Sequence, residues 1–119
     1  GLWEMAMRTC TDPLARMALV PRLMEARGLD ATPQIQRRLE QAGDTAGRAI
    51  LQRILDDEVG HVEIGNRWYG QLCARAGLDP VTAWDGFADA HGASPPRPPF
   101  NREARLRAGF TEGELARWG

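Results

Sequence analysis

Residues 50–72 read ILQRILDDEVGHVEIGNRWYGQL. On a helix, steps of three and four residues bring part of this stretch onto one stripe. The members of the stripe are Ile50, Ile54, Glu58, His61, Gly65, Trp68 and Leu72. The stripe is apolar except in its middle, where a Glu and a His three residues apart project side by side and can reach one metal ion. Helix bundles use this Glu-x-x-His element in di-iron and di-manganese carboxylate sites.

Another acidic residue, Glu25, lies on the apolar face of the preceding helix. The residues that share this face are Leu14, Met17, Ala18, Pro21 and Met24. Burying a carboxylate there costs free energy unless it binds a cation or an arginine. One helix with a single Glu and a next helix with Glu-x-x-His form half of the four-helix carboxylate plan. Glu25, Glu58 and His61 are therefore the predicted metal ligands.

Two simpler interpretations of these residues stay open at this point. Glu58 and His61 can form an ordinary salt bridge at the edge of a core. Glu25 can pair with Arg22 or with another arginine at the rim of that core.

The composition is that of a single globular domain. The chain has 119 residues, of which 43% are hydrophobic and 26% are charged. A net charge of −1 argues against a nucleic-acid-binding protein, and no apolar run approaches the ~20 residues that cross a membrane. The start lacks a signal peptide and an initiating Met, so we expect a cytoplasmic protein with further sequence upstream. Cys10 and Cys73 are predicted to be reduced thiols, with a disulfide as the alternative.

Helix start and stop signals predict an all-α fold. Asp-Pro and Thr-Pro pairs mark helix starts, and glycines mark helix ends. The predicted helices cover residues 13–27, 33–42, 44–76 and 80–91, and a short final helix follows a capping box at Thr111–Glu114. Gly60, Gly65 and Gly70 within the longest helix indicate either close helix approach or glycines without a packing role.

The C-terminal quarter of the chain has a different character. Four prolines in the seven residues 93–99 predict an extended connector. The predicted organisation is a half-bundle over residues 1–92, followed by a connector and tail over 93–119. Phe100, Phe110 and Trp118 are the predicted anchors of this tail.

Several segments together resemble an uncharacterised bacterial family of ferritin-like proteins. They are Leu2–Met5, Asp12–Arg22, Glu25–Asp30, Asp57–Val62, Gly65–Trp68 and Pro99–Arg105. The resemblance covers nearly the whole chain and implies a ferritin-like bundle with a Glu, Glu-x-x-His, Glu, Glu-x-x-His metal pattern. Glu25 matches the Glu of the third helix, and Glu58 with His61 matches the pair of the fourth. The first two helices, with the other three ligands, have no counterpart here.

The resemblance implies a half-bundle of two long helices plus short helices. Its apolar stripes would be left in water, so we expect a missing N-terminal half or a second copy in a homodimer to complete the bundle. A complete site would hold two ions, iron or else manganese, and would act as an oxidoreductase that uses dioxygen or peroxide. Oxidases, ferroxidases and hydroxylases, including hydroxylases of modified tRNA, share this kind of bundle. The rival hypothesis is a non-catalytic helical interaction module.

Overall fold

A computed structural model describes residues 1–9 and 12–119, without the side chains of Ala6 and Arg8. Cys10 lies outside the described residues, and Cys73 is a buried free thiol. Every regular element of the described residues is helical, which confirms the predicted all-α class. None of the helices in these ranges is both long and apolar enough to cross a membrane.

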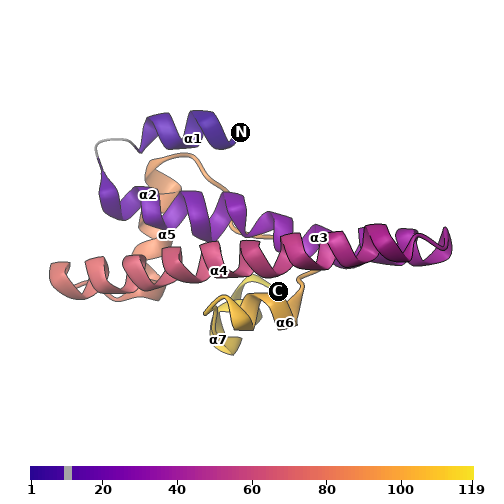
Figure 1. Ribbon diagram of the computed structural model, residues 1–119. Coiled ribbons are helices and arrows are strands. Elements are labelled where there is room, and N and C mark those ends of the chain that lie inside the picture. Colours follow the sequence, from indigo (N-terminus) through magenta and orange to yellow (C-terminus); the bar gives the residue numbers. More distant parts are fainter. Residues whose placement is uncertain (10–11) are drawn as a thin grey trace.

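Two long helical segments lie side by side and form the body of the molecule (Figure 1). The first consists of α2 (Pro13–Leu19), the π-helix η1 (Val20–Glu25) and α3 (Arg27–Gln41). The chain turns at Gly43, whose φ of 72° is left-handed, and returns as α4 (Thr45–Ala76). Asp44 caps α4 by accepting a hydrogen bond from the Gly47 amide at 2.8 Å. The 32 residues of α4 span about 48 Å, close to the 50 Å length of the molecule.

The predicted helix end at Gly28 and the predicted new start at Thr32–Pro33 are both wrong, because α3 continues through them. The Thr32 hydroxyl donates to the Gly28 carbonyl at 2.9 Å instead of capping a new helix. Leu29 and Thr32 are buried, and α3 packs along α4. This packing offsets the local cost of a glycine and a proline within the helix.

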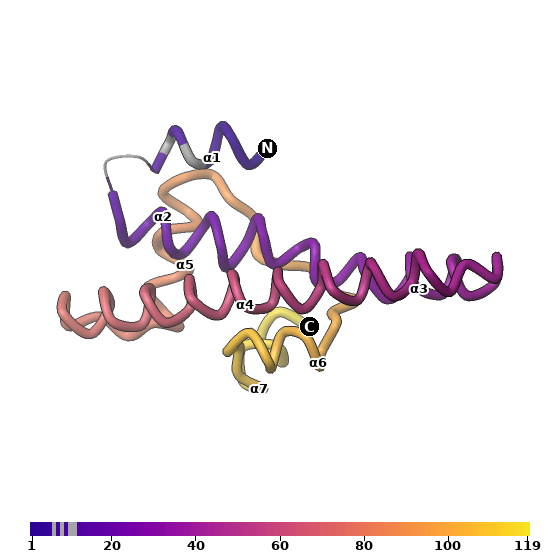
Figure 2. The backbone as a smooth tube through the Cα atoms, in the orientation of Figure 1, coloured from indigo at the N-terminus to yellow at the C-terminus, as the bar shows by residue number. Residues whose placement is uncertain are grey.

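Four shorter helices of the described residues surround the long pair. Figure 2 shows α1 (Leu2–Arg8) next to α2, with α6 (Arg102–Arg107) and α7 (Glu112–Trp118) on the other side of α4. The fourth, α5 (Pro80–Ala90), contacts both α2 and α4. The predicted capping box of α7 is confirmed, with the Thr111 and Glu114 side chains each bonded to the other's backbone amide. Neither α1 nor α6 was predicted.

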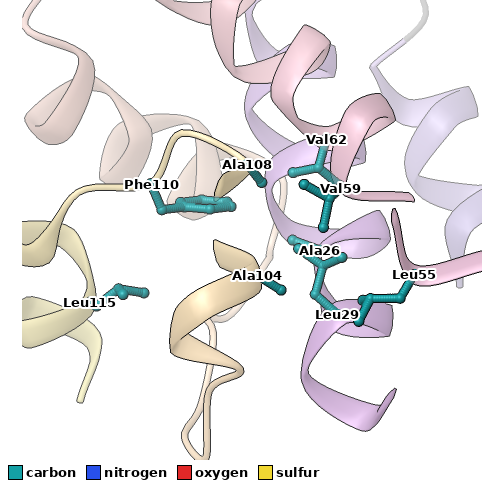
Figure 3. Packing of buried hydrophobic residues seen from close by; sticks show 9 residues of the cluster. All are labelled: Ala26, Leu29, Leu55, Val59, Val62, Ala104, Ala108, Phe110 and Leu115. Atoms are coloured by element: carbon teal, nitrogen blue, oxygen red, sulfur yellow. The ribbon is translucent and has the colours of Figure 1, made fainter. Parts of the chain in front are cut away.

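The buried side chains form two clusters. The first contains Ala26, Leu29, Leu55, Val59, Val62, Ala104, Ala108, Phe110 and Leu115, and Figure 3 shows the tail residues facing α3 and α4. The second contains Met5, Ala18, Leu19, Leu23, Tyr69, Cys73, Trp84 and Ala88. Phe110 is buried, and Phe100 and Trp118 pack against the first cluster, so the predicted anchors of the tail are confirmed.

The long helix α4 has a second apolar face that this chain leaves exposed. Ile50 is 60% exposed, Ile54 58% and Trp68 48%, whereas Tyr69 is only 1% exposed. Trp68, a member of the apolar stripe, is therefore not a core residue in this chain. The stripe read from the sequence lies mainly on this open side, and the buried side runs through Leu55, Val59, Val62, Tyr69 and Cys73.

Candidate metal-ligand site

Two of the three predicted ligands lie together in the middle of α4. The Nδ1 atom of His61 is 3.7 Å from the Oε2 atom of Glu58. The His61 side chain is 68% exposed and that of Glu58 is 32% exposed. Both groups are therefore accessible from the open side of the helix.

The third predicted ligand, Glu25, is half-buried at the end of η1. Burial raises the pKa of its carboxyl group, the charge of Glu58 raises this pKa further, and His61 lowers it. Glu25 therefore lies within electrostatic reach of both other groups. Electrostatic interaction thus links two carboxylates and one imidazole from η1 and α4.

Glu25 has no arginine partner among the residues that the structure describes. Arg22, the partner that the alternative interpretation required, turns toward the C-terminal tail. Its Nη2 donates to Glu114, and its Nε donates to the Asn66 side chain at 2.6 Å. The guanidinium also lies 4.6 Å from the centroid of the Tyr69 ring. Arg22 thus links α7 to α4, and among the described residues it forms no ion pair with Glu25.

The close approach of η1 to α4 depends on Gly65. A Cβ atom at this position would lie 2.4 and 2.5 Å from the Cβ and Cγ atoms of Pro21. At Gly60 and Gly70, an added Cβ would meet nothing within 4 Å. Of the two interpretations of these glycines, close approach therefore holds at Gly65 and not at the other two positions.

The three residues do not by themselves form a finished metal site. In residues 1–9 and 12–119, no group of three or more His, Cys, Asp or Glu side chains is placed to hold an ion. Chemically, the arrangement offers two carboxylates and an imidazole on an open face, and further ligands would have to come from other helices. Two neighbouring acidic residues of α4 form ion pairs with arginines instead. Glu63 pairs with Arg67 at 2.9 Å, and Asp56 pairs with Arg107 at 3.1 Å.

Sequence reasoning missed two buried ion pairs that fix the tail. One joins Arg22 to Glu114, and the other joins Arg105 to Asp30 at 2.7 Å. Their partners are 92 and 75 positions apart in the chain, so no local spacing could reveal them. The capping box of α7 was the only local feature that pointed to Glu114, because it fixes the position of this side chain.

Comparison with known proteins places the chain in a family. The model of a protein family of unknown function, DUF455, matches residues 1–116. The chain belongs to the DUF455 family. A relative from Haemophilus influenzae, described as an uncharacterized protein, is 48% identical over 115 residues, which cover 97% of this chain and 40% of the relative. This DUF455 chain thus spans less than half the length of that relative. No solved structure matches it significantly.

These comparisons confirm the expectation of an uncharacterised family with a bacterial member. The ferritin-like assignment of this DUF455 chain stays a prediction.

Proposed function

We propose that this chain supplies Glu25, Glu58 and His61 to a carboxylate-bridged di-metal centre within a ferritin-like bundle. Iron is the proposed metal, and manganese is the alternative. The observation that carries the proposal is the half-buried Glu25 carboxylate, which lies within electrostatic reach of Glu58 and His61 and has no arginine partner among the described residues. Such a group of like charges is costly without a cation. Divalent ions with oxygen and imidazole ligands would offset that cost.

The ligand set fits one half of such a centre. The complete plan has four Glu and two His on four helices, and here η1 and α4 provide two Glu and one His. The missing ligands would come from further helices, either in the remainder of a longer family-length protein or in a second copy of this chain. The open side of α4, with Ile50, Ile54, Ile64 and Trp68 exposed, is the surface on which those helices would pack.

A di-iron centre of this kind, when loaded, supplies oxidation by dioxygen or peroxide. The chain's own residues would bind and orient the ions. His61 would have to be neutral to ligate, and Glu25 would have to lose its proton, so metal binding should release protons and strengthen as the pH rises. The substrate class does not follow from these residues.

The test is a calorimetric titration of Fe(II), without oxygen, into the chain and two histidine variants. The chain has only two histidines, which makes His91→Ala the matched control for His61→Ala. We expect His61→Ala to weaken binding at least tenfold and His91→Ala to leave it unchanged. The ligand assignment is wrong if His61→Ala binds Fe(II) as tightly as the unmodified chain.

A non-catalytic interaction module is the second candidate, and the exposed apolar residues of α4 favour it specifically. Light scattering with and without Fe(II) separates the two functions. Metal-dependent dimerisation supports a centre shared between two copies. Association that does not respond to Fe(II), together with the absence of binding heat, supports the module.

A further inference from the structure

The Pro-rich connector forms one wall of a pocket that the proposed metal centre does not use. The pocket lies between this connector, the start of α3 and α6, and has a volume of about 560 Å³. Three of its lining residues are arginines, Arg27, Arg97 and Arg105, and three are prolines, Pro95, Pro96 and Pro99. The volume falls within the range of small-molecule sites, about 300–1,000 Å³.

An ion pair between Arg105 and Asp30 lines part of the pocket. Arg105 is 0% exposed, and its Nε and Nη2 atoms donate to the two oxygens of Asp30 at 2.9 and 2.7 Å. Asp30 also accepts a hydrogen bond from the Asn101 amide at 2.8 Å. The Asp30 charge is therefore fully occupied within the protein. The Nη1 atom of Arg105 has no hydrogen-bond partner among the described residues.

The other two arginines carry uncompensated charge. Arg27 and Arg97 are exposed, and neither forms an ion pair within residues 1–9 and 12–119. Glu4 does not line this pocket but an adjoining one, together with Arg27. Since Asp30 neutralises Arg105, the pocket keeps an excess of two positive charges.

We propose that this pocket binds a small organic phosphate monoester. A phosphate monoester carries close to two negative charges at neutral pH, which matches the two free guanidinium groups. Arginine presents a planar fork of N–H donors that suits phosphate oxygens. The proline rings have no N–H groups and offer an apolar wall for the organic part of the ligand. A ligand with a single carboxylate carries one negative charge and would leave one of the two arginines without a counter-charge.

The site is separate from the group of metal-ligand residues. Arg27 lines this pocket, whereas Glu25, Glu58 and His61 do not. Arg27 and Arg97 are both exposed, and neither belongs to a buried cluster. Their removal should therefore leave the fold intact, and the phosphate site can be tested whether or not the chain binds iron.

The experiment is a calorimetric titration of phenyl phosphate and of inorganic phosphate into the 119-residue chain. We expect saturable binding of one phenyl phosphate per chain, tighter than that of inorganic phosphate because the ring contacts the prolines. Arg27→Ala and Arg97→Ala should each weaken binding about tenfold or more, the loss expected for one charge-assisted contact. Arg37→Ala is the matched control, because Arg37 is an exposed arginine of the same helix α3 that does not line the pocket.

Three results would overturn the proposal. The first is the absence of saturable phenyl phosphate binding at millimolar concentrations. The second is equal loss of binding in Arg37→Ala and Arg97→Ala, which would indicate non-specific attraction of anions. The third is arginine-dependent binding of a short RNA oligomer without binding of phenyl phosphate, which would assign the arginines to a polyanion surface. Circular dichroism of each variant verifies that the fold is retained.

Discussion

Replacing Gly65 by Ala tests how closely η1 and α4 pack behind the candidate ligands. The added Cβ would lie 2.4 Å from Pro21 Cβ, whereas ordinary contacts begin near 3.4 Å. Because the proline ring cannot rotate away, η1 and α4 must separate by about 1 Å, and such overpacking costs about 1–3 kcal/mol. Alanine is the better helix former by about 1 kcal/mol, so the net loss of unfolding free energy should be up to about 2 kcal/mol.

Gly60→Ala is the matched control, since an added Cβ there meets nothing within 4 Å and only the helix-propensity gain should remain. Urea unfolding followed by circular dichroism at 222 nm should show unfolding free energies that differ by about 1–3 kcal/mol between the two variants. This difference is the cost of the clash, because both variants share the same gain in helix propensity. For a chain of this size that corresponds to a difference in Tm of very roughly 4–12 °C. If Gly65→Ala stabilises the chain as much as Gly60→Ala does, the two helices do not approach as closely as described.

Two further predictions concern charges in and around the core. Glu114→Gln should destabilise the chain by about 3 kcal/mol in urea unfolding, because it leaves the buried Arg22 without a counter-ion. Glu112→Gln, at an exposed pair with Arg102, should change stability by less than about 1 kcal/mol, and equal effects would contradict the burial argument. Burial raises the pKa of Glu25, so the folded metal-free chain binds the Glu25 proton more strongly than the unfolded chain does. The free energy of unfolding therefore falls as the pH rises from 4.5 through this raised pKa. Glu25→Gln should therefore stabilise the metal-free chain at pH 7, and this gain should vanish below pH 4.5; destabilisation at pH 7 would point to a structural role.

Local signals predicted the elements that local chemistry controls. Asp44, Asp79 and the Thr111–Glu114 box all cap helices where the sequence placed them. The same reasoning failed at Gly28, because the burial of Leu29 against α4 outweighs a local stop signal. Tertiary packing of this kind leaves no trace in short-range spacing.

The candidate site was predictable to the extent that helix geometry determines it. The three-residue spacing of Glu58 and His61 is sufficient to place them side by side. The exposure of Trp68 was not predictable, because α4 has two apolar faces and its sequence does not indicate which face this chain covers. The choice of Glu114 rather than Glu25 as the partner of Arg22 depends on how the tail folds back.

The π-helical turn of η1 is a point at which the chain can gain or lose a residue within a helix. Within η1 the Ala26 amide bonds to the Pro21 carbonyl five residues back, at 3.1 Å, so the turn holds one residue more than an α-helical turn. Loss of a single residue there would convert this turn into an α-helical one, and the segments on either side could keep the same faces toward α4. A neighbouring residue would then occupy the helix face on which Glu25 lies, while the pairing of the two long helical segments stayed the same. Related chains can therefore gain or lose a carboxylate at this point by a change in length alone, and an alignment forced to run without gaps through residues 20–25 would hide that change.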